Sequence, residues 1–351
     1  MADRWLIYGA TGYTGQLAAR LAVARGERPI LAGRRGPAVA ALAADLGLEH
    51  RVVDLADRAG LRAALADVAV VAHCAGPFVD TWTPMVDACL ATGTHYVDIT
   101  GELDVFEAVY ARHDEAVAAR VVLLPGAGFD VVPTDCLAAL LAASLPQAVS
   151  LELAFRAGGG MSPGTARTGL SVTAAGGRRR TGGVLRPTPV GVPSRVVSFP
   201  SGPRRVGAIP WGDLVSAYRS TGIGDLTVYT TLPVRGRIGR LQAAAVGRLL
   251  RYAVPRALAA RLIRRRVTGP SPQTRAATSI EVWGEVRTAG GETRSATLTG
   301  PNAYDLTADA LLRAVARLRT GTVPPGAHTP STALGADFVR ELDGVSLSLP
   351  A

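Results

Sequence analysis

The first 125 residues alternate between short apolar runs and longer stretches with helical spacing. The apolar runs are the expected strands, and they lie at Trp5–Tyr8, Pro29–Ala32, Arg51–Asp54, Ala69–Cys74, His95–Asp98 and Val121–Pro125. Helical spacing fills intervals such as Gly15–Arg25, Ala38–Leu46 and Val105–Ala118. Strands that alternate with helices pair in parallel through right-handed crossovers. We therefore predict an α/β fold whose N-terminal part is a doubly wound parallel sheet.

The pattern changes after Pro133 to a mixture of helices and strands. We expect a helix at Thr134–Leu145 and mobile, glycine-rich loops at 158–160 and 176–180. The β-rich pieces are Val149–Phe155, the short strands of Arg186–Arg205, Gly224–Leu232, Ser279–Val286 and Arg294–Leu298. An amphipathic helix is expected at Leu306–Leu318. These elements predict a first domain over residues 1–145 and a second α+β domain over 146–319, with a role in substrate binding or dimerisation.

The chain has 351 residues, a formal net charge of +10 and 48% hydrophobic residues, enough to bury a substantial core. A basic chain can bind nucleic acid. However, all 38 basic residues are arginine and none is lysine, so a coding bias explains the charge better than a basic patch does. We expect no nucleic-acid partner.

The lack of lysine excludes several kinds of enzyme. Schiff-base chemistry on a lysine is impossible, and so are the Tyr-x-x-x-Lys pair of short-chain dehydrogenases and the lysine of a phosphate-binding P-loop. The cysteines are Cys74, Cys89 and Cys136, whose spacing fits neither a disulfide framework nor a zinc site. We expect no metal. Residues 1–4 lead directly into the first expected strand, and no apolar run is long enough to span a bilayer, so we expect a cytoplasmic protein.

A glycine-rich turn, Gly9-Ala-Thr-Gly-Tyr-Thr-Gly15, follows the first expected strand. At the junction of a first strand and a first helix, such a turn lets the backbone approach a pyrophosphate, and the helix N-terminus supplies N–H donors. The second expected strand is followed by Arg34 and Arg35, where an NAD enzyme usually has an acid. Guanidinium groups suit a 2′-phosphate. The sequence therefore predicts NADP(H) binding.

Other strand ends supply further candidates at the same sheet edge. Asp54 ends the third expected strand, either beside an adenine or as a helix cap. Ala75, Gly76 and Pro77 follow the fourth, where small residues let the backbone run along a cofactor. Candidate proton-transfer groups lie at the ends of the fifth and sixth: they are Tyr96, Asp98 and Glu102 at the fifth, with Asp130 as a weaker candidate at the sixth. His73 and His95 are more simply explained as core residues.

The ordered set of motifs resembles the saccharopine dehydrogenase-like oxidoreductases, and within them the trans-acting enoyl reductase branch. It comprises Gly9–Gly15, Leu31-Ala-Gly-Arg-Arg35, Ala75-Gly-Pro-Phe78, Tyr96-Val-Asp-Ile-Thr-Gly-Glu102 and Gly128-Phe-Asp-Val-Val-Pro-Thr-Asp135. The resemblance implies an NADP-binding Rossmann domain, a second α+β domain, and a final segment, 320–351, that returns to the first. It carries over as cofactor residues Gly9, Thr11, Gly12, Tyr13, Thr14, Gly15 and Arg34.

These features predict an NADPH-dependent reductase that transfers a hydride to an activated C=C of a biosynthetic intermediate, either a small molecule or carrier-linked. The alternatives are an imine (C=N) reductase of the saccharopine-reductase type and a non-catalytic NADP-sensing protein. A homodimer is a further expectation.

The stretch Leu241–Arg266 mixes aliphatic residues with many arginines. A basic amphipathic helix can lie on an anionic membrane or dock an acidic carrier protein. The sequence alone favours a simpler interpretation, a lid helix with a solvated arginine face.

Overall fold

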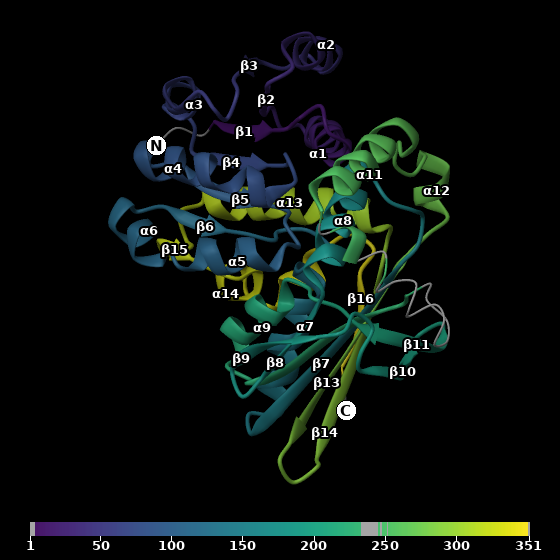
Figure 1. Ribbon diagram of the computed structural model, residues 1–351. Helices are drawn as coiled ribbons and strands as arrows, with labels where there is room; N and C mark the ends of the chain where they lie inside the picture. The colour runs from purple at the N-terminus through teal and green to yellow at the C-terminus, as the bar shows by residue number, and fades with distance from the viewer. Residues whose placement is uncertain (1–3, 233–244, 246–247, 251, 350–351) are drawn as a thin grey trace. The chain divides into compact units, whose positions relative to one another are not determined.

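The computed structural model describes residues 4–232, 245, 248–250 and 252–349 (Figure 1). The chain forms two compact units, residues 1–132 with 304–335 and residues 133–303 with 336–351. These boundaries differ from those drawn from the sequence, because residues 304–319 belong to the first unit, and residues 133–145 and 336–351 belong to the second. The first part of the Leu241–Arg266 stretch lies largely outside the described residues.

The first unit is built on a parallel sheet. Its strands are β1 (Trp5–Tyr8), β2 (Ile30–Gly33), β3 (His50–Val52), β4 (Val70–His73), β5 (His95–Asp98), β6 (Val122–Leu124) and β15 (Gly326–Ala327). Their order is β15-β6-β5-β4-β1-β2-β3, and every neighbouring pair is parallel. The order reverses between β1 and β4, which is where doubly wound sheets bind ligands. The predicted Rossmann-like sheet is confirmed.

The helices of this unit connect successive strands. They are α1 (Tyr13–Ala24), α2 (Gly36–Leu46), α3 (Arg58–Leu65), α4 (Trp82–Thr92), α5 (Leu103–Tyr110), α6 (His113–Ala119), α13 (Ala303–Arg319) and α14 (Pro330–Leu334), with a short 3₁₀ helix η1 (Phe78–Asp80). All residues of β1, β2 and β4 are buried. Strands covered on both faces are apolar throughout, and for this reason they stand out in the sequence.

The stretch predicted as one helix at Val105–Ala118 is two helices, α5 and α6. Arg112 breaks the helix, with φ −90° and ψ 15°. Its guanidinium forms ion pairs with Asp87 of α4 and with Glu115, both at 2.7 Å. One of the ion-pair partners at the break, Asp87, is therefore distant in the sequence.

Helix α13 and strand β15 belong to the first unit although they lie near the end of the sequence, and they are drawn yellow in Figure 1. Asp309 of α13 pairs with Arg25 at the end of α1 at 2.6 Å, and the Thr307 hydroxyl accepts a hydrogen bond from Phe129 N at 3.0 Å. Strand β15 pairs with β6. The first unit is therefore closed by residues nearly 200 positions beyond its main segment.

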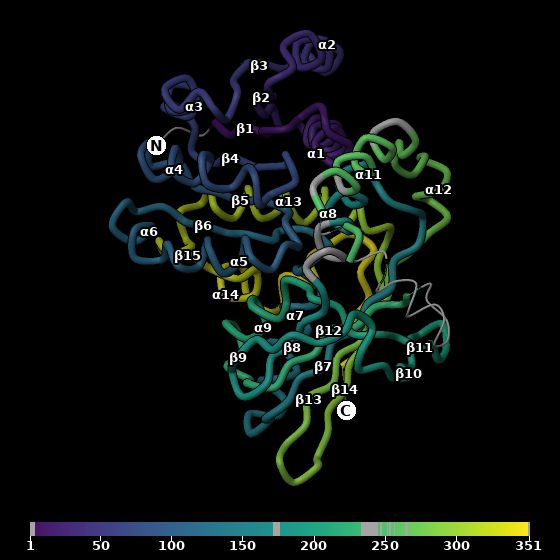
Figure 2. Tube along the Cα trace, viewed as in Figure 1, coloured from purple at the N-terminus to yellow at the C-terminus, as the bar shows by residue number. Residues whose placement is uncertain are grey.

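The second unit contains a mixed sheet with nine strands in the described residues. They are β7 (Ala148–Ala157), β8 (Gly177–Thr181), β9 (Val184–Thr188), β10 (Ser194–Phe199), β11 (Gly202–Ala208), β12 (Asp225–Thr230), β13 (Ile280–Thr288), β14 (Thr293–Gly300) and β16 (Ser346–Ser348). The main path is β10-β11-β12-β7-β13-β14-β16, and β8 and β9 attach beside β12. Figure 2 shows the long β13–β14 hairpin.

The helices of the second unit are α7 (Val132–Ser144), α8 (Pro163–Ala175), α9 (Asp213–Thr221), α11 (Ala253–Arg266) and α12 (Pro272–Ala276), with a 3₁₀ helix η2 (Ala336–Glu341). The expected return of 320–351 to the first domain is therefore divided. Strand β15 joins the first sheet, whereas β16 pairs with β14 in the second.

The expectation of a mobile loop at 176–180 is wrong, because these residues largely form β8. Strand β8 pairs with β9 across Gly182 and Gly183, which have φ +54° and +77°. Two glycines with positive φ are the usual two-residue hairpin turn. Arg180 is anchored by hydrogen bonds to the carbonyls of Leu214 and Gly183 and lies 4.0 Å from the ring centroid of Tyr218.

Within the described part of the chain, no helix combines the length and the apolar character needed to cross a bilayer.

Candidate functional site

The glycine turn after β1 is packed so closely that two of its glycines admit no side chain. Gly9 has φ +80°, and a Cβ there would lie 2.8 Å from Ala75 N. A Cβ on Gly15 would lie 2.4 Å from the carbonyl oxygen of Gly9. The turn, the start of α1 and the end of β4 therefore meet with backbone against backbone, which leaves a cradle at the carboxyl edge of the sheet.

Helix α1 begins at this cradle. Its N-cap is Gly12, and no side chain among the described residues caps it. Thr11, Gly12, Tyr13 and Thr14 are partly exposed, and the first turn carries no acid. The Tyr13 ring packs edge to face on Tyr304, with centroids 4.9 Å apart. A helix start of this kind presents N–H groups and the positive end of the helix dipole to an anion.

Arg34 and Arg35 follow β2 at the same edge, and both are exposed. Arg35 donates a hydrogen bond to the Thr11 hydroxyl at 3.0 Å, so its guanidinium lies beside the glycine turn. Burial raises the pKa of the Tyr8 hydroxyl to about 12, with Asp54 adding to the rise and Arg34 opposing it. The charges of Asp54 and Arg34 therefore both act on Tyr8, at the end of β1.

The helix-cap alternative for Asp54 does not hold for α3, whose N-cap is Asp57. Asp54 instead accepts a hydrogen bond from Ala56 N at 2.9 Å, inside the turn before that helix. Its carboxylate is exposed at the carboxyl edge, where an adenosine would lie in this fold.

Together these residues fit a dinucleotide that carries a 2′-phosphate. Gly9, Gly12 and Gly15 lack side chains, so the backbone of the turn can pack closely and its N–H groups can approach a pyrophosphate. The two arginines offer the charge for a further phosphate, with no acid beside them after β2 to repel it.

The loop after β4 borders the same edge. Ala75, Gly76 and Pro77 are partly exposed there. The Thr81 hydroxyl donates to the Ala75 carbonyl at 2.7 Å, and the Glu102 carboxylate accepts from the N–H groups of Phe78 and Val79, each at 2.9 Å. Two side chains therefore fix this loop.

Tyr96 and Asp98, two of the predicted proton-transfer groups, are completely buried. The Tyr96 hydroxyl donates to Asp98 Oδ2 at 2.5 Å, and Asp98 Oδ1 accepts from the N–H groups of Thr100 and Gly126. Burial raises the pKa of Asp98 to about 6 and that of Tyr96 well above its usual range. With Glu102 engaged by the β4 loop, the geometry favours a positioning role for all three, and their part in proton transfer stays a prediction.

Asp130 has a different environment. It is partly exposed, and a Cβ on Gly101 would lie 2.9 Å from its Oδ2, so its carboxyl group lies between the loops after β5 and β6. Burial raises its pKa to about 7, and the Glu102 carboxylate adds to the rise. A partly exposed carboxylic acid that titrates near neutrality suits proton donation.

His73 ends β4 beneath this edge and is fully buried. Its Nε2 lies 3.1 Å from the Thr81 hydroxyl, and burial lowers its pKa to about 3. Thr81 donates its one proton to the Ala75 carbonyl, so the neutral ring donates from Nε2. The expectation that His73 is a core residue agrees with this burial.

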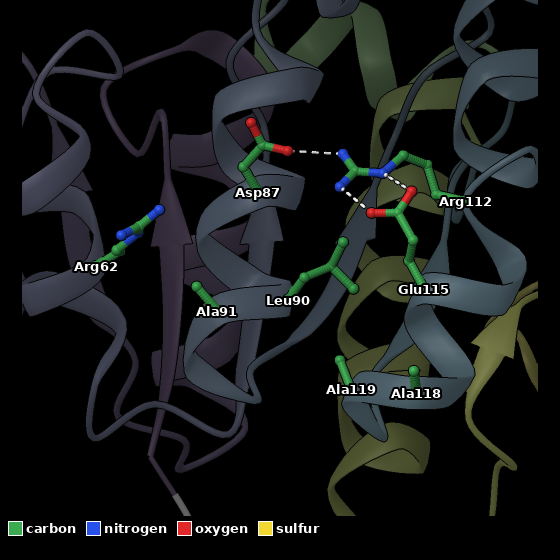
Figure 3. Close-up of a pocket in the computed structure, with 8 residues that line it drawn as sticks. All are labelled: Arg62, Asp87, Leu90, Ala91, Arg112, Glu115, Ala118 and Ala119. Carbon is green, nitrogen blue, oxygen red and sulfur yellow. Dashed lines mark hydrogen bonds and ion pairs between the residues drawn. The ribbon is translucent and has the colours of Figure 1, made fainter.

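A shallow hollow of about 490 Å³ lies away from the glycine turn, between α3, α4 and α6. Figure 3 shows its ion-paired wall, where Arg112 lies between Asp87 and Glu115, with Arg62 on the opposite side. Its charges are largely paired with one another, so it contributes nothing to the site at the sheet edge.

Two residues of the edge were missed in the sequence. Thr81 and Thr307 each hold a loop by one hydroxyl, and threonine is too common for either to stand out. The contact of Glu102 with Phe78 and Val79 has a physical reason, because the adjacent N–H groups at the start of a 3₁₀ helix need an acceptor.

Residues 5–124 match the family model of the saccharopine dehydrogenase NADP binding domain. The N-terminal part of this chain is such a domain. The match ends with β6 and so covers the glycine turn, Arg34 and Arg35, and the loops after β4 and β5, all of which border the edge described above.

Curated relatives match about a third of the chain. A trans-acting enoyl reductase of Mycobacterium leprae is 35% identical over 138 residues, 37% of this chain and 33% of that protein. Another, from Mycobacterium bovis, is 32% identical over 140 residues, with the same coverage. The matched region thus spans about a third of the length of these relatives.

The whole chain has a counterpart among solved structures. The apo saccharopine dehydrogenase (L-Glu forming) of Saccharomyces cerevisiae superposes with a TM-score of 0.65 at 13% identity, covering 99% of this chain and all of that one. A likeness at this identity shows a shared fold, with an N-terminal parallel sheet and a second mixed sheet.

Proposed function

We propose that this protein is an NADPH-dependent reductase that transfers a hydride to an activated C=C, of the enoyl or enone type, in a biosynthetic intermediate. The observation that carries the proposal is the sheet edge of the first unit, where the glycine cradle, Arg34 and Arg35, and Asp130 lie around one rim. The enoyl reductase names of the Mycobacterium relatives support the choice of substrate.

Cofactor binding follows from the cradle. The backbone of Gly9 to Gly15 and the start of α1 hold the pyrophosphate, and Arg34 and Arg35 hold the 2′-phosphate. Ala75, Gly76 and Pro77 leave room along the edge, and Asp54 lies on the adenosine side. Arg35 is already placed by its bond to Thr11, so little ordering of its side chain opposes binding.

Bound NADPH supplies the hydride, and the chain must supply a proton. Addition of hydride to the β-carbon of an enoyl group leaves charge on the carbonyl oxygen and requires a proton at the α-carbon. Asp130 is the proton donor in this proposal, because it is the partly exposed acid of the rim and is partly protonated near neutral pH. Tyr96, Asp98 and Glu102 position the loops around it.

Two alternatives use the same edge. Reduction of an imine needs only a proton at nitrogen, which Asp130 also provides. A non-catalytic NADP sensor is favoured by one observation, the engagement of Tyr96, Asp98 and Glu102 in internal hydrogen bonds. A small-molecule or carrier-linked substrate, a homodimer and a cytoplasmic location belong to the same proposal.

Steady-state turnover distinguishes these functions. We expect the purified protein to oxidise NADPH with an α,β-unsaturated thioester or enone, and much more slowly with cyclic imines. Faster oxidation of NADPH with imines would show that the bond reduced is C=N. Tight NADPH binding in a fluorescence titration, with no turnover of any substrate in the set, would replace the reductase by the sensor.

A further inference from the structure

A long stretch of the second unit is basic and contains no acidic residue. Between Asp225 and Glu281 the sequence has eleven arginines and no aspartate or glutamate. The chain as a whole carries 28 acidic residues in 351, so a run of this length without one is unusual. Helix α11 is the longest described element within it.

Helix α11 exposes its large aliphatic side chains. Val254, Leu258 and Leu262 are 79%, 68% and 54% exposed. Their spacing of four residues places them in one stripe along the helix. The face that includes Ala259, Ala260 and Ile263 is less exposed, and α11 packs against α8. The helix therefore presents its leucines away from the unit it packs on.

Two further exposed apolar residues lie just before α11. Leu249 and Tyr252, just before α11, are 56% and 66% exposed. Arg248, Arg261 and Arg266 are exposed beside it. We call these eight residues the α11 face, namely Arg248, Leu249, Tyr252, Val254, Leu258, Arg261, Leu262 and Arg266.

This arrangement is opposite to that of a solvated lid helix. Such a helix would bury its leucines and expose its arginines, whereas the α11 face exposes both. A surface that combines exposed aliphatic side chains with exposed arginines, in a stretch of sequence without acids, suits an anionic, deformable partner.

We propose that the α11 face docks the protein on an anionic lipid surface, with the helix lying flat in the headgroup region. Val254, Leu258 and Leu262 enter the acyl boundary, Tyr252 lies at headgroup level, and the arginines contact lipid phosphates. An acidic protein partner would need matched pockets for the three aliphatic side chains. A lipid surface accepts them without any fixed geometry, so the observations favour lipid.

The proposal is independent of the reductase function. It requires no cofactor and uses no residue of the glycine-turn edge. Docking on lipid would bring a reductase to substrates with long acyl chains, but the binding itself can be measured without turnover.

The test is co-sedimentation of the full-length protein with vesicles. We expect binding to vesicles of phosphatidylcholine mixed with phosphatidylglycerol, little binding to pure phosphatidylcholine, and weakening at high salt. Double variant Leu258→Gln/Leu262→Gln should bind at least about tenfold more weakly. Arg261→Gln/Arg266→Gln should lose about fivefold for each charge at low salt.

Matched controls separate the face from general surface effects. Val149 and Val184 are 47% and 49% exposed elsewhere in the same unit, so Val149→Gln/Val184→Gln should bind vesicles as the unchanged protein does. Arg58 and Arg62 are exposed arginines of the first unit, and Arg58→Gln/Arg62→Gln is the control for charge. Circular dichroism melting checks that each variant is folded.

Three results would overturn the proposal. One is no binding to anionic vesicles, and another is equal binding by the leucine variant and its valine control. The third is a dimer of the unchanged protein that becomes monomeric in Leu258→Gln/Leu262→Gln, measured by light scattering, because a second copy would then cover the face.

Discussion

At the residue scale, the proposed preference for NADPH over NADH rests on the two arginines after β2. Arg35 lies within hydrogen-bonding distance of Thr11, and the charge of Arg34 acts on Tyr8 at the end of β1. A 2′-phosphate placed between them gains charge-assisted hydrogen bonds, and a 2′-hydroxyl gains little.

Replacing Arg34 by alanine should weaken NADPH binding by about 1.5–3 kcal/mol and leave NADH binding nearly unchanged. Fluorescence titration with both dinucleotides measures the difference. Arg58→Ala, an exposed arginine of the same unit, is the control and should change neither affinity. Equal losses for NADPH and NADH would show that Arg34 does not contact the 2′-phosphate.

Asp130 should make stability depend on pH. Its pKa is raised from 3.8 to about 7, so the fold favours the neutral acid. This contribution is complete below pH 3.8 and is lost as the pH rises through 7. The free energy of unfolding of Asp130→Asn should therefore match that of the unchanged protein near pH 4 and exceed it at pH 8 by about 1–2 kcal/mol. This difference is smaller than the pKa shift alone would give, because Asp130 is partly exposed.

Urea unfolding at the two pH values measures the effect of Asp130. The control is Asp114→Asn, an exposed carboxylate at the start of α6 that should show no such crossover. If Asp130 is also the proton donor, Asp130→Asn lowers kcat about 10²–10⁴-fold and keeps the affinity for NADPH. An unchanged kcat would remove that role.

At the scale of elements, the cradle depends on how closely α1 approaches β1. Gly15 allows this contact because a Cβ there would meet the backbone of Gly9. Glu102 and Thr81 hold the loop after β4, and Asp98 holds the loops after β5 and β6. Side-chain hydrogen bonds therefore fix the loops of the rim.

Gly15→Ala should cost about 1–3 kcal/mol of stability and weaken NADPH binding, because backbone atoms must move to admit the methyl group. Gly169→Ala in α8 is the matched control, since a Cβ there meets nothing within 4 Å. That control should be neutral or gain up to about 1 kcal/mol. Equal behaviour of the two variants in thermal melting and NADPH titration would show that the cradle is not tight.

At the scale of the whole molecule, the NADP-binding unit is discontinuous in sequence. Its main segment ends at residue 132, and α13, β15 and α14 join it after the chain has passed through residues 133–303 of the second unit. Helix α13 buries eleven residues, including Asp309, which pairs with Arg25. The family match to residues 5–124 therefore covers only part of the folding unit.

A chain that stops after Ala303 should fail to bind NADPH, although residues 5–124 are intact, because the removal of α13 and β15 exposes the core of the first unit. A chain that stops after Val345 loses only β16 from the second sheet and should keep its affinity. Soluble yield and NADPH titration compare the two. Wild-type affinity in the shorter chain would show that α13 is dispensable.

The sequence by itself determined the parallel sheet and the position of its binding edge. Buried parallel strands tend to be apolar runs, and the predicted range Trp5–Tyr8 is that of β1. The predicted range His95–Asp98 is also that of β5, although this strand begins and ends with a polar residue. The glycine turn was also visible, because backbone contact and positive φ require glycine at fixed positions.

Only the tertiary structure decided the rest, because it depends on partners that are distant in sequence. Arg112, at the break between α5 and α6, pairs with Asp87 of α4, and Asp309 of α13 pairs with Arg25 at the end of α1. The acids after β5 read as free proton donors in the sequence, and the structure engages them with the loops after β4 and β6. A local pattern shows where a carboxylate is, but the chain folded around it determines whether its hydrogen bonds are already used.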